Sequence, residues 1–201
     1  YTKLVETWPK TQEAKDALAG IKNIYVDQNK VDEYFDFVKA SGQGSDVSVD
    51  EQDNLSYMAA ENVFMEGDYT RARQYFDRYL DKFPNGQFLM NAHYFRADCY
   101  FRAAEYSKAL SSYEWIISKG RSDFSELAQI RTAAIYYHQQ NYDQARGIYI
   151  KLNAEAEVPS NIMDARIGLM RCNYMLKNYS DVIDIDASKL EPIVAFPSLP
   201  S

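Results

Sequence analysis

The chain has 201 residues, of which 46% are hydrophobic and 14% aromatic, so it has ample material for a folded core. The formal net charge is −7 and lysine and arginine are not clustered, which argues against binding to the phosphates of nucleic acids. No stretch approaches the ~18 consecutive apolar residues of a membrane-spanning helix, so we expect no membrane span.

The first forty residues predict the end of one helical hairpin and then a complete, degenerate hairpin. Residues 1–9 are similar to the second half of later units, because Pro9 stands where Pro84 ends a helix further along. We therefore expect the numbering to begin inside a repeat of a longer or processed protein. Residues 15–40 follow as the degenerate hairpin, and Gly42 interrupts its helical pattern.

The clearest unit spans residues 53–86 and contains two amphipathic stretches. Small and apolar residues recur in each stretch at the spacing of one helix face, Gly67 separates the two stretches, and Pro84 ends the second. Similar units follow at residues 90–119, 126–153 and 163–190. After them, three prolines within residues 191–201 predict a non-helical tail.

A tyrosine recurs near the start of the second stretch of every later unit. The successive spacings are 37, 36 and 37 residues, and the tyrosines are Tyr69, Tyr106, Tyr142 and Tyr179. A small or branched residue follows three positions later in each unit, at Ala72, Ala109, Ala145 and Val182. Repetition at this period predicts a solenoid, in which each hairpin packs on its neighbours.

The small residues Ala60 and Ala72, the aromatic Phe76, the large apolar Tyr79 and the closing Pro84 resemble the pattern of tetratricopeptide repeats. The resemblance implies an all-α fold, a right-handed α-α superhelix of about five helical hairpins over residues 1–190.

The spacing of the units adds a second resemblance. Periods of 36 and 37 residues exceed the family's usual ~34. They are similar to those of cell-envelope proteins that assist Tol-Pal function or outer-membrane assembly. This resemblance implies a bacterial protein in the periplasm or cell envelope, with the cytoplasm as the alternative.

The residue types that carry catalysis or bind metals are sparse and isolated. His93 and His138 have no second ligand three or four residues away, which argues against a zinc site. Cys99 and Cys172 occupy the same place in first helices two repeats apart, so we interpret both as small buried residues rather than as a disulfide. The glycines form no phosphate-binding loop. We therefore expect no enzymatic activity, metal or cofactor.

In tetratricopeptide repeats the first helices form a concave wall, and residues offset from the packing stripe face it. The matching positions predict a partner-binding groove rich in aromatic residues, lined by Tyr57, Glu61, Phe64, Tyr94, Asp98, Phe101, Tyr137, His138, Arg171 and Tyr174. A contiguous apolar surface of this kind usually contacts another molecule. The alternative interpretation is that neighbouring first helices pack these rings against one another.

These observations predict a non-enzymatic scaffold that binds a protein or peptide segment in its aromatic groove, with a role in envelope assembly or maintenance. The alternative is a carbohydrate-binding or enzyme-recruiting module of a larger protein, in which the same tyrosines stack on sugar rings. Nucleic acid is not an expected partner, for the reason of charge given above.

Overall fold

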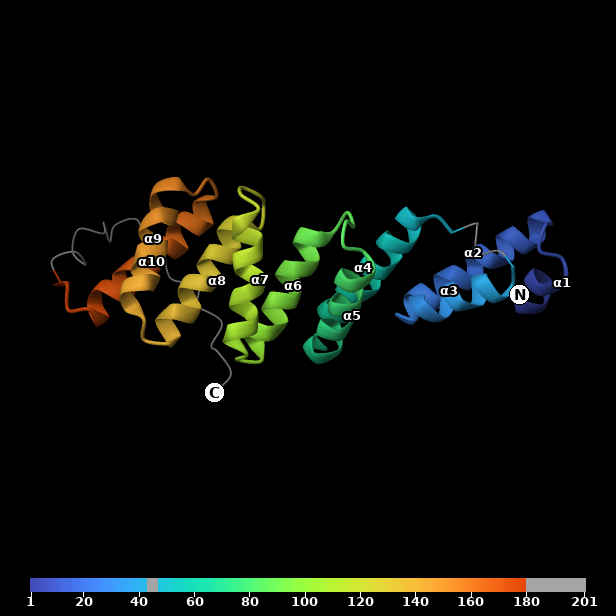
Figure 1. Cartoon of the computed structure of the whole chain (residues 1–201), viewed down its shortest axis with the longest axis horizontal. Helices are drawn as coiled ribbons and strands as arrows, with labels where there is room; N and C mark the ends of the chain where they lie inside the picture. Colours follow the sequence, from blue (N-terminus) through green and yellow to red (C-terminus); the bar gives the residue numbers. More distant parts are fainter. Residues whose placement is uncertain (43–46, 180–201) are drawn as a thin grey trace. The chain divides into compact units, whose positions relative to one another are not determined.

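The computed structural model describes residues 1–42 and 47–179. In this part of the chain every regular element is an α-helix and there is no strand, which confirms the predicted all-α fold. Figure 1 labels the helices, which are α1 (Thr2–Thr7), α2 (Gln12–Asp27), α3 (Val31–Ala40), α4 (Val49–Met65), α5 (Tyr69–Lys82), α6 (Leu89–Arg102), α7 (Tyr106–Ser118), α8 (Ser125–His138), α9 (Tyr142–Glu155) and α10 (Pro159–Met175). The predicted tail, residues 191–201, lies outside the described residues.

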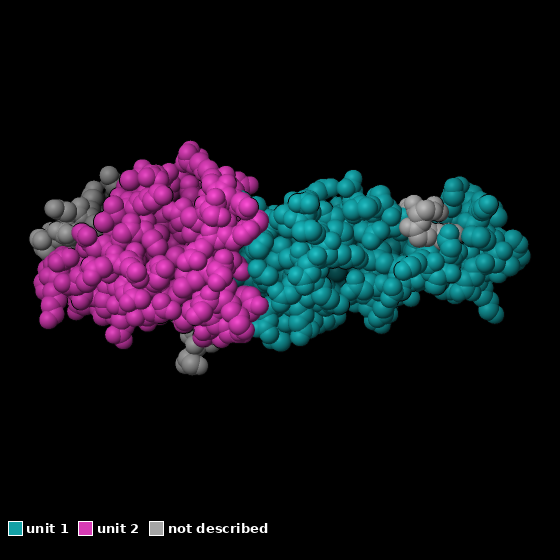
Figure 2. All heavy atoms as spheres, in the orientation of Figure 1, with its two compact units in different colours: residues 1–99 teal, residues 100–201 magenta. Residues whose placement is uncertain are grey.

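The chain divides into two compact units, Tyr1–Cys99 and Tyr100–Ser201, which Figure 2 shows in different colours. The helix α6 begins in the first unit and ends in the second. The prediction that residues 1–190 form a single continuous solenoid is not tested by these separate units and stays a prediction.

In the first unit, helices that follow one another in sequence pack together, from α1 on α2 to α4 on α5. Three of these helices begin with a side chain that accepts a hydrogen bond from the backbone of the first turn. These N-caps are Thr11, Ser48 and Asp68. The core of the α4–α5 hairpin includes Ala60, Ala72 and Phe76, none of which has exposed surface. The small residues allow the two helices to approach closely.

In the second unit α7 packs on α8, α8 on α9, and α10 on both α8 and α9. Its core again combines small and large residues, with Ala133, Ala145 and Cys172 fully buried and Tyr149 and Leu152 nearly so. The first helix of one repeat therefore lies against both helices of the preceding repeat, which is the stacking that a solenoid requires.

The turn inside each hairpin contains one residue with a positive φ angle at an equivalent position. In the clear repeats these residues are Gly67 (φ 85°), Ala104 (57°), Gln140 (62°) and Lys177 (62°). A left-handed residue after a helix redirects the chain and satisfies the helix's last carbonyls. Only glycine adopts this conformation without a steric cost from its side chain.

We therefore expect Ala104→Gly to raise the free energy of unfolding. Relief of the left-handed strain is worth about 1–2 kcal/mol, and the greater freedom of glycine in the unfolded chain costs about 0.4–1 kcal/mol, so the net gain is roughly 0.5–1 kcal/mol. Gly67→Ala is the matched control, because a Cβ at Gly67 meets no atom within 4 Å and only the φ angle opposes it. It should lower stability. Urea denaturation measures both, and changes of the same sign would contradict this account.

Candidate functional site

Of the predicted groove residues in the first unit, Tyr57 and Glu61 contact each other. The Tyr57 hydroxyl donates a hydrogen bond to Oε1 of Glu61 over 2.7 Å. The Tyr57 ring stacks on Phe88, with centroids 4.4 Å apart, and the residue is only 4% exposed. The expectation that Tyr57 faces an open groove is therefore corrected, because Phe88, which directly precedes α6, covers its ring.

The predicted groove residues on α6 are also largely covered. Asp98 is 3% exposed and Phe101 7% exposed, whereas Tyr94 is partly buried and packs edge-on against Phe95. The helix buries Ala97, Asp98 and Cys99 in succession, so more than one of its faces is covered. This differs from the expectation that Asp98 and Phe101 present accessible side chains.

Four of the predicted aromatic residues share one contact inside their own repeat. Each lies near the end of a first helix and packs against the tyrosine five residues later. The pairs are Phe64–Tyr69, Phe101–Tyr106, Tyr137–Tyr142 and Tyr174–Tyr179, with centroids 5.2 to 5.9 Å apart. These rings brace the hairpin turn, which is a structural role that their groove positions did not predict. Phe64 also packs on Phe95 of the next first helix, at 4.8 Å.

The two predicted residues that are exposed, His138 and Tyr174, lie on α8 and α10 of the second unit, which pack against each other. Tyr137 and Arg171 are partly buried, His138 is exposed, and Tyr174 is 63% exposed. We call these four residues the first-helix wall. Burial raises the pKa of Tyr137, and the positive charge of the Arg171 guanidinium opposes that rise.

The His138 ring is kept neutral at neutral pH. It lies parallel to Tyr106, at a centroid distance of 6.4 Å, and partial burial lowers its pKa below the ordinary value of 6.5. The wall therefore offers a neutral imidazole, two phenols and one guanidinium.

Sequence reasoning missed two charged residues beside this wall. The Arg131 guanidinium lies 5.2 Å from the ring centre of Phe101, and its charge acts on Asp164 of α10. Burial raises the pKa of Asp164, and Arg131 opposes the rise. Asp164 could have been found, because it precedes the groove residue Arg171 by seven residues and so lies two helical turns away on the same face.

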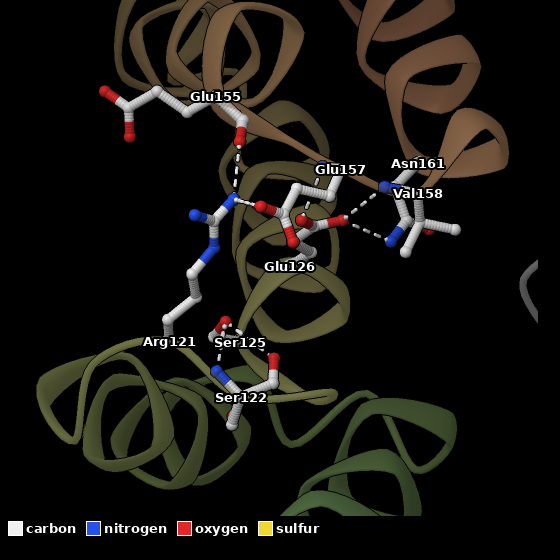
Figure 3. Close-up of polar contacts among 8 residues, drawn as sticks. All are labelled: Arg121, Ser122, Ser125, Glu126, Glu155, Glu157, Val158 and Asn161. Carbon is white, nitrogen blue, oxygen red and sulfur yellow. Dashed lines mark hydrogen bonds and ion pairs between the residues drawn. The ribbon is translucent and has the colours of Figure 1, made fainter.

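A second feature of the same unit is a cleft at the turns between repeats, with a volume of about 540 Å³. We call it the turn cleft. Its walls come from the ends of α7 and α9 and the start of α8, and they include Ile117, Arg121, Glu126, Lys151, Leu152 and Ala156. Arg121 donates to the carbonyl oxygen of Glu155 at 3.1 Å and pairs with the Glu157 carboxylate at 2.9 Å, as Figure 3 shows.

Glu126 anchors the start of α10 from the first turn of α8. Its Oε1 accepts a hydrogen bond from the backbone N–H of Glu157 at 2.8 Å, and its Oε2 accepts one from Nδ2 of Asn161, also at 2.8 Å (Figure 3). Burial by itself would raise the pKa of Glu126, but the hydrogen bonds from Asn161 and the backbone outweigh it and lower the pKa below 4.5.

This shift predicts a pH-dependent contribution to stability. Because the folded-state pKa is depressed, the contribution of Glu126 is complete above the unfolded-state pKa and is lost as the pH falls through the folded-state value. Glu126→Gln should therefore reduce the free energy of unfolding at pH 7 by more than it does at pH 3. Urea denaturation at the two pH values measures this difference in the loss of stability. Glu155→Gln is the control, because it changes an exposed carboxylate nearby. A loss that is the same at both values would contradict the prediction.

The first unit holds its equivalent turn in a similar way. Asp53, which is 4% exposed, accepts a hydrogen bond from the Tyr79 hydroxyl on one oxygen and from the backbone N–H of Gln87 on the other, at 2.7 Å. The Tyr79 oxygen accepts in turn from the N–H of Phe88 at 3.1 Å. Repeat spacings of 37 and 36 residues make Asp53 and Glu126, which are 73 residues apart, equivalent positions. A carboxylate thus anchors the following repeat in both units.

The two cysteines are free thiols in the core, Cys99 at 2% and Cys172 at 0% exposure. Burial raises the pKa of the Cys172 thiol to about 11, which disfavours the reactive thiolate. Among the residues that the structure describes, no three His, Cys, Asp or Glu side chains gather in a way that could hold a metal ion. Nor does any helix there have the length and apolar character to cross a membrane.

The sequence matches the family described as "Tetratricopeptide repeat-like domain" over residues 45–156, more than half of the chain. The chain belongs to this tetratricopeptide repeat-like family. The matched region contains helices α4 to α9 and the turn cleft. It also contains two of the four residues of the first-helix wall, Tyr137 and His138. No curated protein sequence is significantly similar to the chain.

Solved structures share the fold of this tetratricopeptide repeat-like protein at low sequence identity. A tetratricopeptide repeat protein from Parabacteroides merdae is 19% identical with a TM-score of 0.58, over 85% of this chain and 63% of that one. MamA from Desulfovibrio magneticus is 16% identical with a TM-score of 0.54, over 88% and 97% of the two chains. A structure of TPR-like repeats from Podosopora anserina is 12% identical with a TM-score of 0.55, over 85% and 90%. These likenesses support the solenoid fold alone.

Proposed function

We propose that this tetratricopeptide repeat-like protein is a non-enzymatic scaffold that binds an unfolded or extended protein segment on its first-helix wall. The fold is typically a non-catalytic scaffold, and it generally mediates contacts between proteins. The proposal narrows this general role to one surface of the second unit, formed by residues of α8 and α10.

The observation that carries the proposal is the exposure of Tyr174, which is 63% despite its contact with Tyr179. Beside it, Tyr137 and Arg171 are only partly buried and His138 is exposed. Aromatic rings and arginine are the residue types that contribute most to binding energy at protein interfaces. Apolar or aromatic side chains of a partner would therefore pack on the two phenols, while Arg171 would select among their neighbours.

We also propose a setting in the bacterial periplasm or cell envelope, in assembly or maintenance of that structure. The support is the repeat period of 36 and 37 residues, which is similar to that of envelope proteins of this family. Fractionation of cells expressing the natural full-length gene tests this setting. Recovery of the protein with the cytoplasmic fraction would contradict it.

A titration with a soluble, permanently unfolded protein tests the binding function. Reduced and carboxymethylated α-lactalbumin, labelled for fluorescence anisotropy, is expected to bind the chain saturably. Tyr174→Ser should weaken this binding about tenfold, because loss of an aromatic contact residue typically costs more than 1 kcal/mol. Absence of saturable binding would contradict the proposal.

The matched control is Ile150→Ser, which removes a comparably exposed apolar side chain from the second helix α9. It should leave the affinity unchanged. A glycan panel run in parallel addresses the alternative of carbohydrate recognition. Binding of glycans without binding of the unfolded protein would favour that alternative instead.

A further inference from the structure

The turn cleft of the second unit, with a volume of about 540 Å³, lies where the first unit carries larger side chains at equivalent positions. Four residues that line it follow residues of the first unit by 73 positions: Gln129 follows Ser56, Lys151 follows Arg78, Leu152 follows Tyr79, and Glu155 follows Lys82. Those four residues of the first unit line a hollow of about 30 Å³ that extends to Val31 and Asp32 at the start of α3, so it overlaps the equivalent place only in part.

Two aromatic rings occupy the equivalent positions of the first unit. Tyr79 and Phe83 are 1% and 8% exposed, and their ring centroids are 5.4 Å apart. Their equivalents in the second unit are Leu152 and Ala156, both of which line the turn cleft. The turn cleft therefore lacks both rings and the phenolic hydroxyl.

The second unit keeps a carboxylate at the position of Asp53, although it has no tyrosine at the position of Tyr79. In the first unit the Tyr79 hydroxyl donates its hydrogen bond to Asp53, a carboxylate on the first helix. The equivalent Glu126 lines the turn cleft, where its Oε1 accepts a hydrogen bond from the backbone N–H of Glu157 and its Oε2 accepts one from Nδ2 of Asn161. A carboxylate oxygen can accept two hydrogen bonds, so Glu126 can accept another donor.

From these observations we infer that the turn cleft binds a tyrosine side chain of a partner protein, with the ring against Leu152 and Ala156 and the hydroxyl donating to Glu126. The site is separate from the first-helix wall, and it rests on the proposed function only in that its ligand belongs to a protein. The ring takes the space that Tyr79 and Phe83 take in the first unit, and the hydroxyl repeats the contact of Tyr79 with Asp53.

The occupant is not one of the tyrosines of residues 1–201. All 17 tyrosines of the chain lie within the described residues, so neither residues 43–46 nor residues 180–201 can supply a phenol. None of the described tyrosines lines the turn cleft. The residues that do line it come from α7, α8, α9 and the turns next to them, all within the second unit.

The test uses N-acetyl-L-tyrosinamide as the probe and the whole chain labelled with ¹⁵N. Saturable chemical-shift changes are expected at the amides of Ser125, Glu126, Gln129 and residues 151–156. N-acetyl-L-phenylalaninamide should bind about tenfold more weakly, because it lacks the hydrogen bond to a charged acceptor. Absence of saturable changes at these amides, or equal affinity for the two probes, would overturn the inference.

Filling the cleft with the residues of the first unit provides the matched variants. Leu152→Tyr combined with Ala156→Phe should abolish probe binding, and Ala156→Phe alone, at the less buried position, should weaken it at least tenfold. The wall variant Tyr174→Ser should leave probe binding unchanged. If the filled variants still bind the probe, the inference is wrong, whatever the outcome with unfolded protein. Probe binding without binding of unfolded protein would instead count against the proposed function alone.

Discussion

Replacement of Asp53 by alanine is expected to lower the free energy of unfolding by roughly 2–4 kcal/mol. The carboxylate is buried and accepts hydrogen bonds from the Tyr79 hydroxyl and the Gln87 backbone. Without it the buried Tyr79 hydroxyl loses its acceptor, and so does the backbone N–H of Gln87. Burial and the Asp53 contact both raise the pKa of Tyr79 above its ordinary value, so the phenol cannot adapt by losing its proton at neutral pH.

Urea denaturation with an unchanged m-value measures this loss. Asp50→Ala is the matched control, since Asp50 is exposed in the first turn of the same helix, and its removal should cost only a few tenths of a kcal/mol. A double-mutant cycle with Tyr79→Phe should show the two substitutions to be strongly non-additive. Equal losses for Asp53→Ala and Asp50→Ala would contradict the anchoring role.

Replacement of Gly168 by alanine is the second large effect that the structure predicts. Alanine normally stabilises a helix relative to glycine by about 0.5–1 kcal/mol. At Gly168 of α10, however, an added Cβ would lie 2.6 Å from Cδ2 of Tyr149 and closer still to two other ring atoms. Tyr149 is 2% exposed and lies in the core of α9, so it cannot move aside without cost. We expect a net loss of roughly 1–3 kcal/mol.

Gly147→Ala supplies the control within the same pair of helices. Gly147 lies in α9, is exposed, and an added Cβ there would meet no atom within 4 Å. This substitution should therefore raise stability by about 0.5–1 kcal/mol. The opposite signs of the two glycine substitutions are the expected result of thermal or urea denaturation. A stabilising effect at both positions would show that α9 and α10 are further apart than described.

The repeat pattern of the sequence was enough to predict the helical architecture. Tyr69, Tyr106 and Tyr142 recur at nearly constant spacing, and each begins the second helix of a hairpin. Such regularity is visible in the sequence because the residues on one face of a helix lie only three or four positions apart. The solenoid fold follows because each repeat buries the apolar face of its helices against the next repeat.

The candidate site was predicted only in part, because exposure depends on residues far away in sequence. Tyr57 has the right register for a groove, yet Phe88, 31 residues later, covers its ring. Register alone cannot show such a contact. Tyr174 shares that register and stays exposed. The turn cleft is still less visible in the sequence, because Leu152 and Ala156, which line it, stand out only against Tyr79 and Phe83 at the equivalent positions of the first unit.

The central claim is that the first-helix wall binds an unfolded protein segment. Its most direct test is an NMR titration of the ¹⁵N-labelled chain with reduced and carboxymethylated α-lactalbumin. The account predicts saturable shift changes centred on Tyr137, His138, Arg171 and Tyr174. Changes confined to the second helices α7 and α9, or no saturable changes in the second unit, would contradict it.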